Sequence, residues 1–161
     1  MSVITMHLAE EIAQKVHDAA ELYHRLVLVV GPSGSGKTAA LREISRLKGF
    51  NYVNLNLELS RLLLGLTERQ RSLQLPSLID GIIDKDQSGV ILLDNIEILF
   101  EVSLKIDPLR LLQQISRNRI VVATWNGKIE NGYLICAEPD HREYRRYPLT
   151  GLMVINPEKK V

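Results

Sequence analysis

One segment, GPSGSGKT at residues 31–38, limits the possible folds of this chain more than any other feature. It fits the pattern G-x-x-x-x-G-K-[ST] in full, directly after the apolar run LVLVV (26–30) and directly before the helix-forming stretch AALREISRLK (39–48). A strand, a glycine-rich loop and a helix in this order surround a phosphate with backbone N–H groups and the positive end of a helix dipole. The segment therefore predicts a phosphate-binding loop, or P-loop, in an α/β domain.

Each residue type in this loop has a chemical role. Glycines permit the tight loop, Lys37 reaches the β- and γ-phosphates of a nucleoside triphosphate, and the Thr38 hydroxyl can ligate Mg²⁺. The predicted cofactors are therefore ATP and Mg²⁺. The residues expected to contact the nucleotide are Gly31, Pro32, Ser33, Gly34, Ser35, Gly36, Lys37, Thr38 and Ala39.

Apolar runs and helical patterns alternate along the whole chain, which predicts a mainly parallel sheet between helices. Strand candidates occupy 26–30, 52–56, 90–93, 120–124, 133–137 and 152–156, and helical stretches occupy 5–25, 39–48, 57–66, 77–85 and 107–118. Thr5 is the expected N-cap of the first helix, and Pro76 is expected to separate two helices. Residues 127–132 have the composition of a turn, and EPDHREYRRYP (138–148) that of an exposed charged loop.

Residues 1–161 read as one domain, with an N-terminal amphipathic helix in residues 1–25. Its apolar stripe either covers the domain's own sheet or meets another chain; the stripe comprises Leu8, Ile12, Val16, Ala19 and Tyr23. The net charge of +1 and the 45% hydrophobic content are typical of a soluble globular protein and demand neither nucleic acid nor membrane. Since no secretory signal is visible, we expect a cytoplasmic protein.

The segment GVILLDNIEILF (89–100) predicts the second half of the site. Asp94 ends an apolar strand, as a Walker B aspartate does, and would hold Mg²⁺ together with Thr38; the alternative is an N-cap or loop aspartate. In the additional-strand class of P-loop ATPases, a further strand lies between the P-loop strand and the Walker B strand. The polar residue at its tip, called sensor 1, faces the γ-phosphate. Thr124 and Asn126 both match it, unless Asn126 only caps a turn.

Many such ATPases place a glutamate directly after the aspartate to accept a proton from the attacking water. Here that position is Asn95, and an amide can orient a water but cannot accept its proton. Glu97 either replaces the base, if the chain turns sharply after Asp94, or has a structural or interface role. Because losing a general base costs about 10²–10⁴ in rate, we expect ATP binding without fast hydrolysis by the isolated chain.

The sequence DNIE resembles the Walker B motif of initiator-type AAA+ proteins, which implies an AAA+-like core. The chain ends at Val161, soon after the last strand candidate, so we expect no C-terminal helical lid and a homo-oligomer or partner that completes the site. AAA+ proteins place an arginine finger just before the fifth strand, facing the neighbour's nucleotide. Arg145 and Arg146 match this position, and Arg117 and Arg119 are weaker candidates; a solvated basic loop is the alternative.

Four stretches together resemble BrxF, a family of small P-loop proteins encoded in a subset of bacteriophage exclusion (BREX) defence systems. They are GPSGSGKT, VNLNLELSRLLL, ILLDNIEILF and EPDHREYRRYP, and the resemblance extends over nearly the whole chain. It implies a cytoplasmic ATP-binding component of an anti-phage assembly. The partners that it implies are the larger BREX ATPase, the phosphatase-like protein and the DNA methyltransferase.

Two other functions fit parts of the sequence. A small P-loop kinase could use Arg142, Arg145 and Arg146 as a phosphate-clamping lid. A nucleic-acid-binding module is suggested by HREYRRY (141–147), where basic and aromatic residues alternate, so DNA is a possible partner, directly or through other proteins. A solvated charged loop explains the same segment. The polar tip of the fourth strand and the DNIE motif favour the ATPase.

Overall fold

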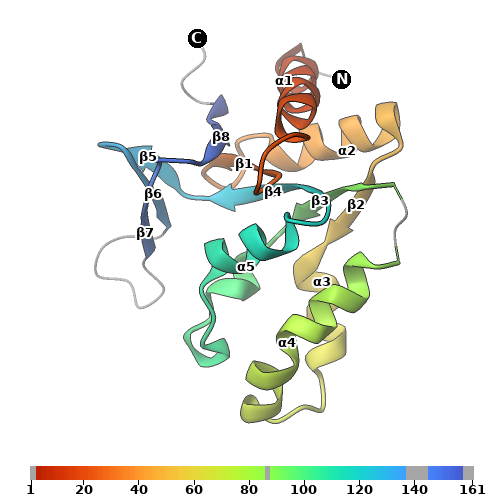
Figure 1. Cartoon of the computed structure of the whole chain (residues 1–161), viewed down its shortest axis with the longest axis vertical. Coiled ribbons are helices and arrows are strands. Elements are labelled where there is room, and N and C mark those ends of the chain that lie inside the picture. Colours follow the sequence, from red (N-terminus) through yellow and green to blue (C-terminus); the bar gives the residue numbers. More distant parts are fainter. Residues whose placement is uncertain (1–2, 86–87, 137–144, 158–161) are drawn as a thin grey trace.

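Two sheets organise the chain in the computed structural model, which describes residues 3–85, 88–136 and 145–157 (Figure 1). The strands are β1 (Leu26–Gly31), β2 (Asn51–Asn54), β3 (Val90–Asp94), β4 (Ile120–Asn126), β5 (Lys128–Glu130), β6 (Tyr133–Cys136), β7 (Arg145–Pro148) and β8 (Met153–Ile155). The α-helices are α1 (Val3–Ala19), α2 (Lys37–Lys48), α3 (Leu55–Leu63), α4 (Glu68–Ile83) and α5 (Pro108–Ile115). Two short 3₁₀ helices, η1 (Glu97–Phe100) and η2 (Val102–Leu104), follow β3.

The larger sheet is parallel throughout, with the strand order β2-β3-β4-β1-β8. Strand β4 therefore lies between the P-loop strand β1 and the strand β3 that ends in Asp94. This is the additional-strand arrangement, and it confirms the predicted α/β P-loop fold with a mainly parallel sheet between helices. Because the strands are parallel, their carboxyl ends meet at one edge, where Gly31 pairs with Asn126 and Asn54 pairs with Asp94.

Strand β1 shows why helices cover both faces of this sheet. Its side chains alternate between two apolar clusters: Leu26, Leu28 and Val30 belong to one, and Val27 and Val29 to the other. Helices α1 and α2 contribute to the Val27 side, and α3, α4 and α5 to the Leu28 side (Figure 1). A strand buried on both faces reads as a continuous apolar run, as 26–30 does.

The smaller sheet is antiparallel, with the order β5-β6-β7, and it corrects two predictions. The predicted turn at 127–132 contains β5, and only Asn131 and Gly132 form the hairpin turn, both with positive φ. The chain bends out of the parallel sheet at Gly127, where a Cβ would collide with the carbonyl oxygen of Ile135. The predicted exposed loop 138–148 ends in strand β7, and its residues 138–144 lie outside the described ranges.

Helix boundaries also differ from the predicted ones. Pro76 lies inside α4 and does not separate two helices; the break comes earlier, at Gly65, which has φ 85°. Thr67 then starts α4 with a capping box, in which Gln70 is the reciprocal partner. A proline inside a helix costs about 3 kcal/mol. Leu75 and Ile79, both fully buried on either side of Pro76, hold the helix together across it.

Two more predicted boundaries were wrong. Thr5 lies within α1, which begins at Val3, so it does not cap the helix. Residues 55 and 56, predicted as strand, start α3 because the Asn54 side chain accepts a hydrogen bond of 3.1 Å from the Leu57 N–H and caps that helix. In the described ranges, no helix combines the length and apolarity needed to span a bilayer.

The apolar stripe of α1 packs on the domain itself. Leu8, Ile12 and Val16 are buried with β1 and α2, whereas Tyr23 lies beyond the end of the helix and is 67% exposed. Deleting residues 1–22 would uncover this face of the sheet, so we expect an aggregating product. Light scattering during purification measures this. A soluble, folded product that only fails to assemble would show instead that the helix serves an interface.

Candidate nucleotide-binding site

The P-loop joins β1 to α2, and Lys37 is the first residue of that helix. Lys37 is 5% exposed, and its Nζ donates hydrogen bonds to Gly31 O (2.7 Å), Pro32 O (2.6 Å) and Ser35 Oγ (3.3 Å). Gly36, the residue before the helix, has φ 92°, which favours glycine. The loop therefore curls around the ammonium group, and its N–H groups precede a helix N-terminus, as phosphate binding requires.

A cavity of about 300 Å³ lies beside this loop at the carboxyl edge of the sheet. It brings together most of the predicted site, because its lining residues are Ser33, Gly34, Gly36, Lys37, Thr38, Ala39, Asp94, Asn95 and Asn126. Gly31, Pro32 and Ser35 belong to the loop but do not line the cavity; they hold the Lys37 ammonium. The segments before α2, after β3 and after β4 are far apart in sequence, and the parallel strand order places them together.

The Asp94 carboxylate is the most densely bonded group at this edge, and it is 2% exposed. Its Oδ2 accepts hydrogen bonds from the Thr38 hydroxyl (2.7 Å) and the Tyr52 hydroxyl (2.6 Å). Its Oδ1 accepts from the Thr124 hydroxyl (2.7 Å) and the Asn95 N–H (3.0 Å). Burial alone would raise the pKa of Asp94, but these four donors outweigh it and hold the pKa below its ordinary value. The residue is ionised at neutral pH.

Thr38 and Asp94 are the residues that can hold a divalent cation. Both face the cavity, and both offer oxygen ligands, which Mg²⁺ prefers. In the described part of the chain, no group of three or more His, Cys, Asp or Glu side chains is placed to hold a metal. This fits Mg²⁺, which commonly uses one or two protein ligands and takes the rest from phosphates and water.

Tyr52 is the one residue of this cluster that sequence reasoning missed. It lies on β2 opposite Leu92, two residues before Asp94, and its hydroxyl reaches the carboxylate along the shared face of the sheet. Burial and the neighbouring Asp94 carboxylate raise the pKa of Tyr52. The Arg42 guanidinium lies 5.2 Å from its ring centroid and covers it from α2. Only the knowledge that β2 neighbours β3 would have identified Tyr52.

The two sensor candidates occupy different places. Thr124 is 3% exposed and points its hydroxyl at Asp94, without lining the cavity. Asn126 lines the cavity, and its side-chain amide donates a hydrogen bond to the Glu97 carboxylate. Of the two, Asn126 is therefore the one placed to face a bound phosphate.

Asn95 and Glu97 are also separated by the fold. The chain turns after Asp94 because Asn95 has φ 53°, a left-handed conformation that asparagine tolerates better than most residues. Asn95 lines the cavity. Glu97 lies on η1 behind Asn126 and does not line it. The position expected to carry the base thus holds an amide, and the Glu97 carboxylate contacts the site through Asn126.

The candidate arginines lie away from the cavity. Arg145 and Arg146 are on β7, and the Arg146 guanidinium lies 3.7 Å from the ring centroid of Tyr133. Arg119 bonds to Ile83 O (3.1 Å) and Asp84 (3.0 Å) at the far end of α4. Arg117 covers the ring of Tyr23, and Arg142, proposed for a kinase lid, lies outside the described ranges.

Replacing Tyr52 with phenylalanine tests the carboxylate cluster. The pKa of Asp94 is lower in the folded protein than in the unfolded chain, where it is near 4. The ionised carboxylate therefore stabilises the fold above the unfolded pKa, and this stabilisation is lost as the pH falls through the folded pKa. Tyr52→Phe removes one donor, so we expect a loss of about 1–3 kcal/mol at pH 7 that shrinks below about pH 4. Urea unfolding at pH 7 and at pH 3 measures this loss of stability. Tyr23→Phe, at an exposed ring, is the control, and an equal loss at pH 7 and pH 3 would contradict the explanation.

Comparisons with known proteins identify no family for this chain. No family model matches it, and no curated protein matches it. Among the solved structures that match, that of C. elegans PCH-2 aligns with a TM-score of 0.45 and 18% sequence identity over 81% of this chain. The match covers 40% of the PCH-2 chain. Similarity at this level supports no statement about activity.

Proposed function

We propose that the protein binds ATP and Mg²⁺ in the cavity beside the P-loop, and that it hydrolyses ATP slowly unless another subunit or partner completes the site. The observation that carries this proposal is the 2.7 Å hydrogen bond between Thr38 and Asp94, directly beside a full P-loop motif. The hydroxyl that follows the P-loop lysine and the buried, ionised carboxylate at the end of β3 are the two protein ligands that P-loop proteins use for Mg²⁺, and here they are in direct contact.

Different residues of this chain bind the phosphates and the Mg²⁺ ion. Loop N–H groups and the start of α2 receive the phosphates, and the Lys37 ammonium exchanges its bonds to the loop carbonyls for phosphate oxygens. Thr38 and Asp94 hold Mg²⁺, which when bound neutralises charge on the phosphate oxygens. Tyr52 and Thr124 keep the Asp94 carboxylate ionised and oriented.

Slow hydrolysis follows from the residue after Asp94. Asn95 lines the cavity but carries no base, and Glu97 is engaged by Asn126. Because ATP would be hydrolysed slowly, the protein would persist in an ATP-bound form that differs from its form without ATP. This makes a nucleotide-controlled switch, or an ATPase activated by assembly, the function that the geometry supports best.

One measurement tests the proposal directly. The mass of the full chain in solution is determined with and without ATP and Mg²⁺, and phosphate release is measured on the same sample. We expect ATP to bind only when Mg²⁺ is present, slow release, and a larger assembly in the ATP state. Absence of ATP binding at millimolar nucleotide would refute the proposal.

Asn95→Glu tests the missing base. A carboxylate at this cavity-lining position should raise phosphate release by up to about 10²-fold, the lower end of the range for a general base. The left-handed backbone at Asn95 will cost the glutamate about 1–2 kcal/mol of stability. Glu97→Gln is the matched control: because glutamine still offers Asn126 an acceptor, turnover should change less than tenfold. Loss of all hydrolysis in Glu97→Gln would identify Glu97 as the base. If neither variant alters turnover, this region does not limit hydrolysis.

The cellular role rests on the resemblance to BrxF alone, and we propose it on that basis. The protein would be the small nucleotide-responsive component of a BREX defence assembly, with the large ATPase, the phosphatase-like protein or the DNA methyltransferase as partners. Co-purification of the tagged chain with each of these proteins, with and without ATP, tests this role. Failure to capture any of these proteins, with or without ATP, would refute the proposed cellular role and would not bear on the proposal of a nucleotide site.

A further inference from the structure

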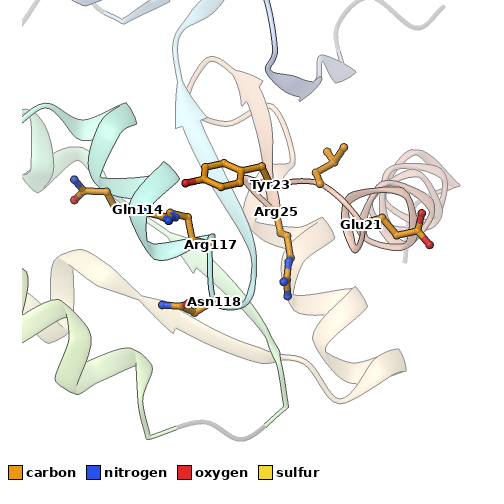
Figure 2. Close-up of a pocket in the computed structure, with 7 residues that line it drawn as sticks. Glu21, Tyr23, Arg25, Gln114, Arg117 and Asn118 are labelled. Atoms are coloured by element: carbon orange, nitrogen blue, oxygen red, sulfur yellow. The ribbon is translucent and has the colours of Figure 1, made fainter.

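A second, larger cavity lies at the opposite edge of the parallel sheet from the P-loop. It has a volume of about 750 Å³ and lies between the segment that leads into β1 and the segment that joins α5 to β4 (Figure 2). Backbone hydrogen bonds hold the two segments together, from Arg25 N–H to Ser116 O (3.0 Å) and from Val121 N–H to Arg25 O (2.8 Å). This volume is in the range of small-molecule sites.

Arg25 is the unusual residue of this cavity. Its Nε is buried, yet it has no hydrogen-bond partner, and within the described ranges no carboxylate pairs with its guanidinium. Buried polar atoms are nearly always hydrogen-bonded, and a charged donor without a partner is destabilising. A ligand that supplies an acceptor would remove this cost.

Arg117 provides a second guanidinium on the facing wall. Its charge centre lies 4.9 Å from the ring centroid of Tyr23, which covers one face of the group and leaves the N–H groups at its edge available. Figure 2 shows Arg25 and Arg117 on opposite sides of the space, whereas the side chains of Gln114 and Asn118 extend away from Arg25. Glu21 also lines the cavity, but its carboxylate points away from both arginines (Figure 2).

We propose that this cavity binds the phosphate group of a small phosphorylated ligand of about nucleotide size. Two guanidiniums on opposite walls offer more N–H donors than the two oxygens of a carboxylate can accept, whereas a phosphate presents three or four oxygens. The remaining volume accommodates the rest of such a ligand. The site is separate from the P-loop and does not depend on the proposed ATPase.

The experiment uses the full chain with Lys37→Ala, which disables the P-loop, and inorganic pyrophosphate as the probe. We expect calorimetric titration to show one remaining site. Adding Arg25→Gln or Arg117→Gln should weaken that site about tenfold or more, because each removes charge-assisted hydrogen bonds. In the otherwise unaltered chain, the Nε–Hε NMR signal of Arg25 should shift as pyrophosphate is added. Arg117 is exposed, so its variant keeps the fold and isolates the effect on binding.

Arg110→Gln is the matched control, because Arg110 is an exposed arginine of α5 that does not line the cavity. Equal weakening by Arg110→Gln would show general charge attraction and overturn the site. The proposal is also overturned if the Lys37→Ala protein binds no pyrophosphate, or if both cavity variants bind it unchanged. Glutarate serves as the carboxylate probe, and binding as tight as that of pyrophosphate would overturn the assignment to phosphate.

Discussion

Lys37→Ala is expected to weaken ATP binding by at least about 10²-fold in the presence of Mg²⁺. The ammonium lies within the P-loop and can donate to two phosphate oxygens, and each hydrogen bond to a charged group contributes about 1.5–3 kcal/mol. Since about 1.4 kcal/mol corresponds to a factor of ten, two such bonds account for two to four orders of magnitude. Calorimetric titration of the full chain with ATP and Mg²⁺ measures the change.

Lys48→Ala is the matched control for this variant. Lys48 is an exposed lysine at the other end of the same helix, so its loss changes the net charge equally and leaves the loop intact. The thermal midpoint of each variant must also be measured, because Lys37 ties three groups of the loop together. Unaltered ATP affinity in a folded Lys37→Ala protein would show that the P-loop does not bind this nucleotide.

The parts of the fold that sequence predicted well are those that short segments determine. A continuous apolar run such as 26–30 identifies a strand buried on both faces, and GPSGSGKT identifies the turn that follows it. The carboxylate at Asp94 was found in the same way, from the end of an apolar run. None of these inferences required knowledge of which strands are neighbours.

The errors have a common origin in long-range packing. The sequence of Arg145–Pro148 predicts a charged loop, yet it forms β7. Tyr147 packs against Trp125 at 5.8 Å between ring centroids and donates a hydrogen bond of 3.0 Å to Asp107. Pro76 predicts a helix break, but burial of the residues on both sides of it keeps α4 continuous. Tyr52 gave no local signal because its partner Asp94 is 42 residues away. In each case the deciding contact joins segments that the sequence does not place together.

The structure also separates two residues that the sequence treated alike. Side chains alternate along β7, so Arg145 is half-buried on the same face as Tyr147, whereas Arg146 is exposed on the opposite face and lies over Tyr133. Neither lines the cavity of its own P-loop. If the sheet of one subunit presents an arginine to its neighbour, Arg146 is therefore the better placed of the two. The cation–π contact holds its guanidinium in one plane and leaves its edge free to donate.

If the protein assembles as proposed, Arg146→Ala is expected to lower its ATP turnover by about 10³-fold or more, the range found for arginine fingers in related NTPases. The γ-phosphate transition state carries negative charge that Lys37 and Mg²⁺ balance only in part, and an arginine from a neighbour would supply the rest. Phosphate release is measured at saturating ATP, with Arg145→Ala as the control on the other face of the same strand. A loss confined to Arg145→Ala would transfer the role to that residue.

Mixing two inactive proteins then distinguishes a finger in trans from a structural role. The Lys37→Ala protein keeps its Arg146, and the Arg146→Ala protein keeps its P-loop, so a mixed assembly contains junctions where both are intact. Recovered turnover above that of either variant alone is the expected result, because the intact halves come from different chains. A structural defect in β7 would not be repaired by mixing. If Arg146→Ala and the double variant with Arg145→Ala both hydrolyse ATP at the parent's rate, β7 does not complete the site.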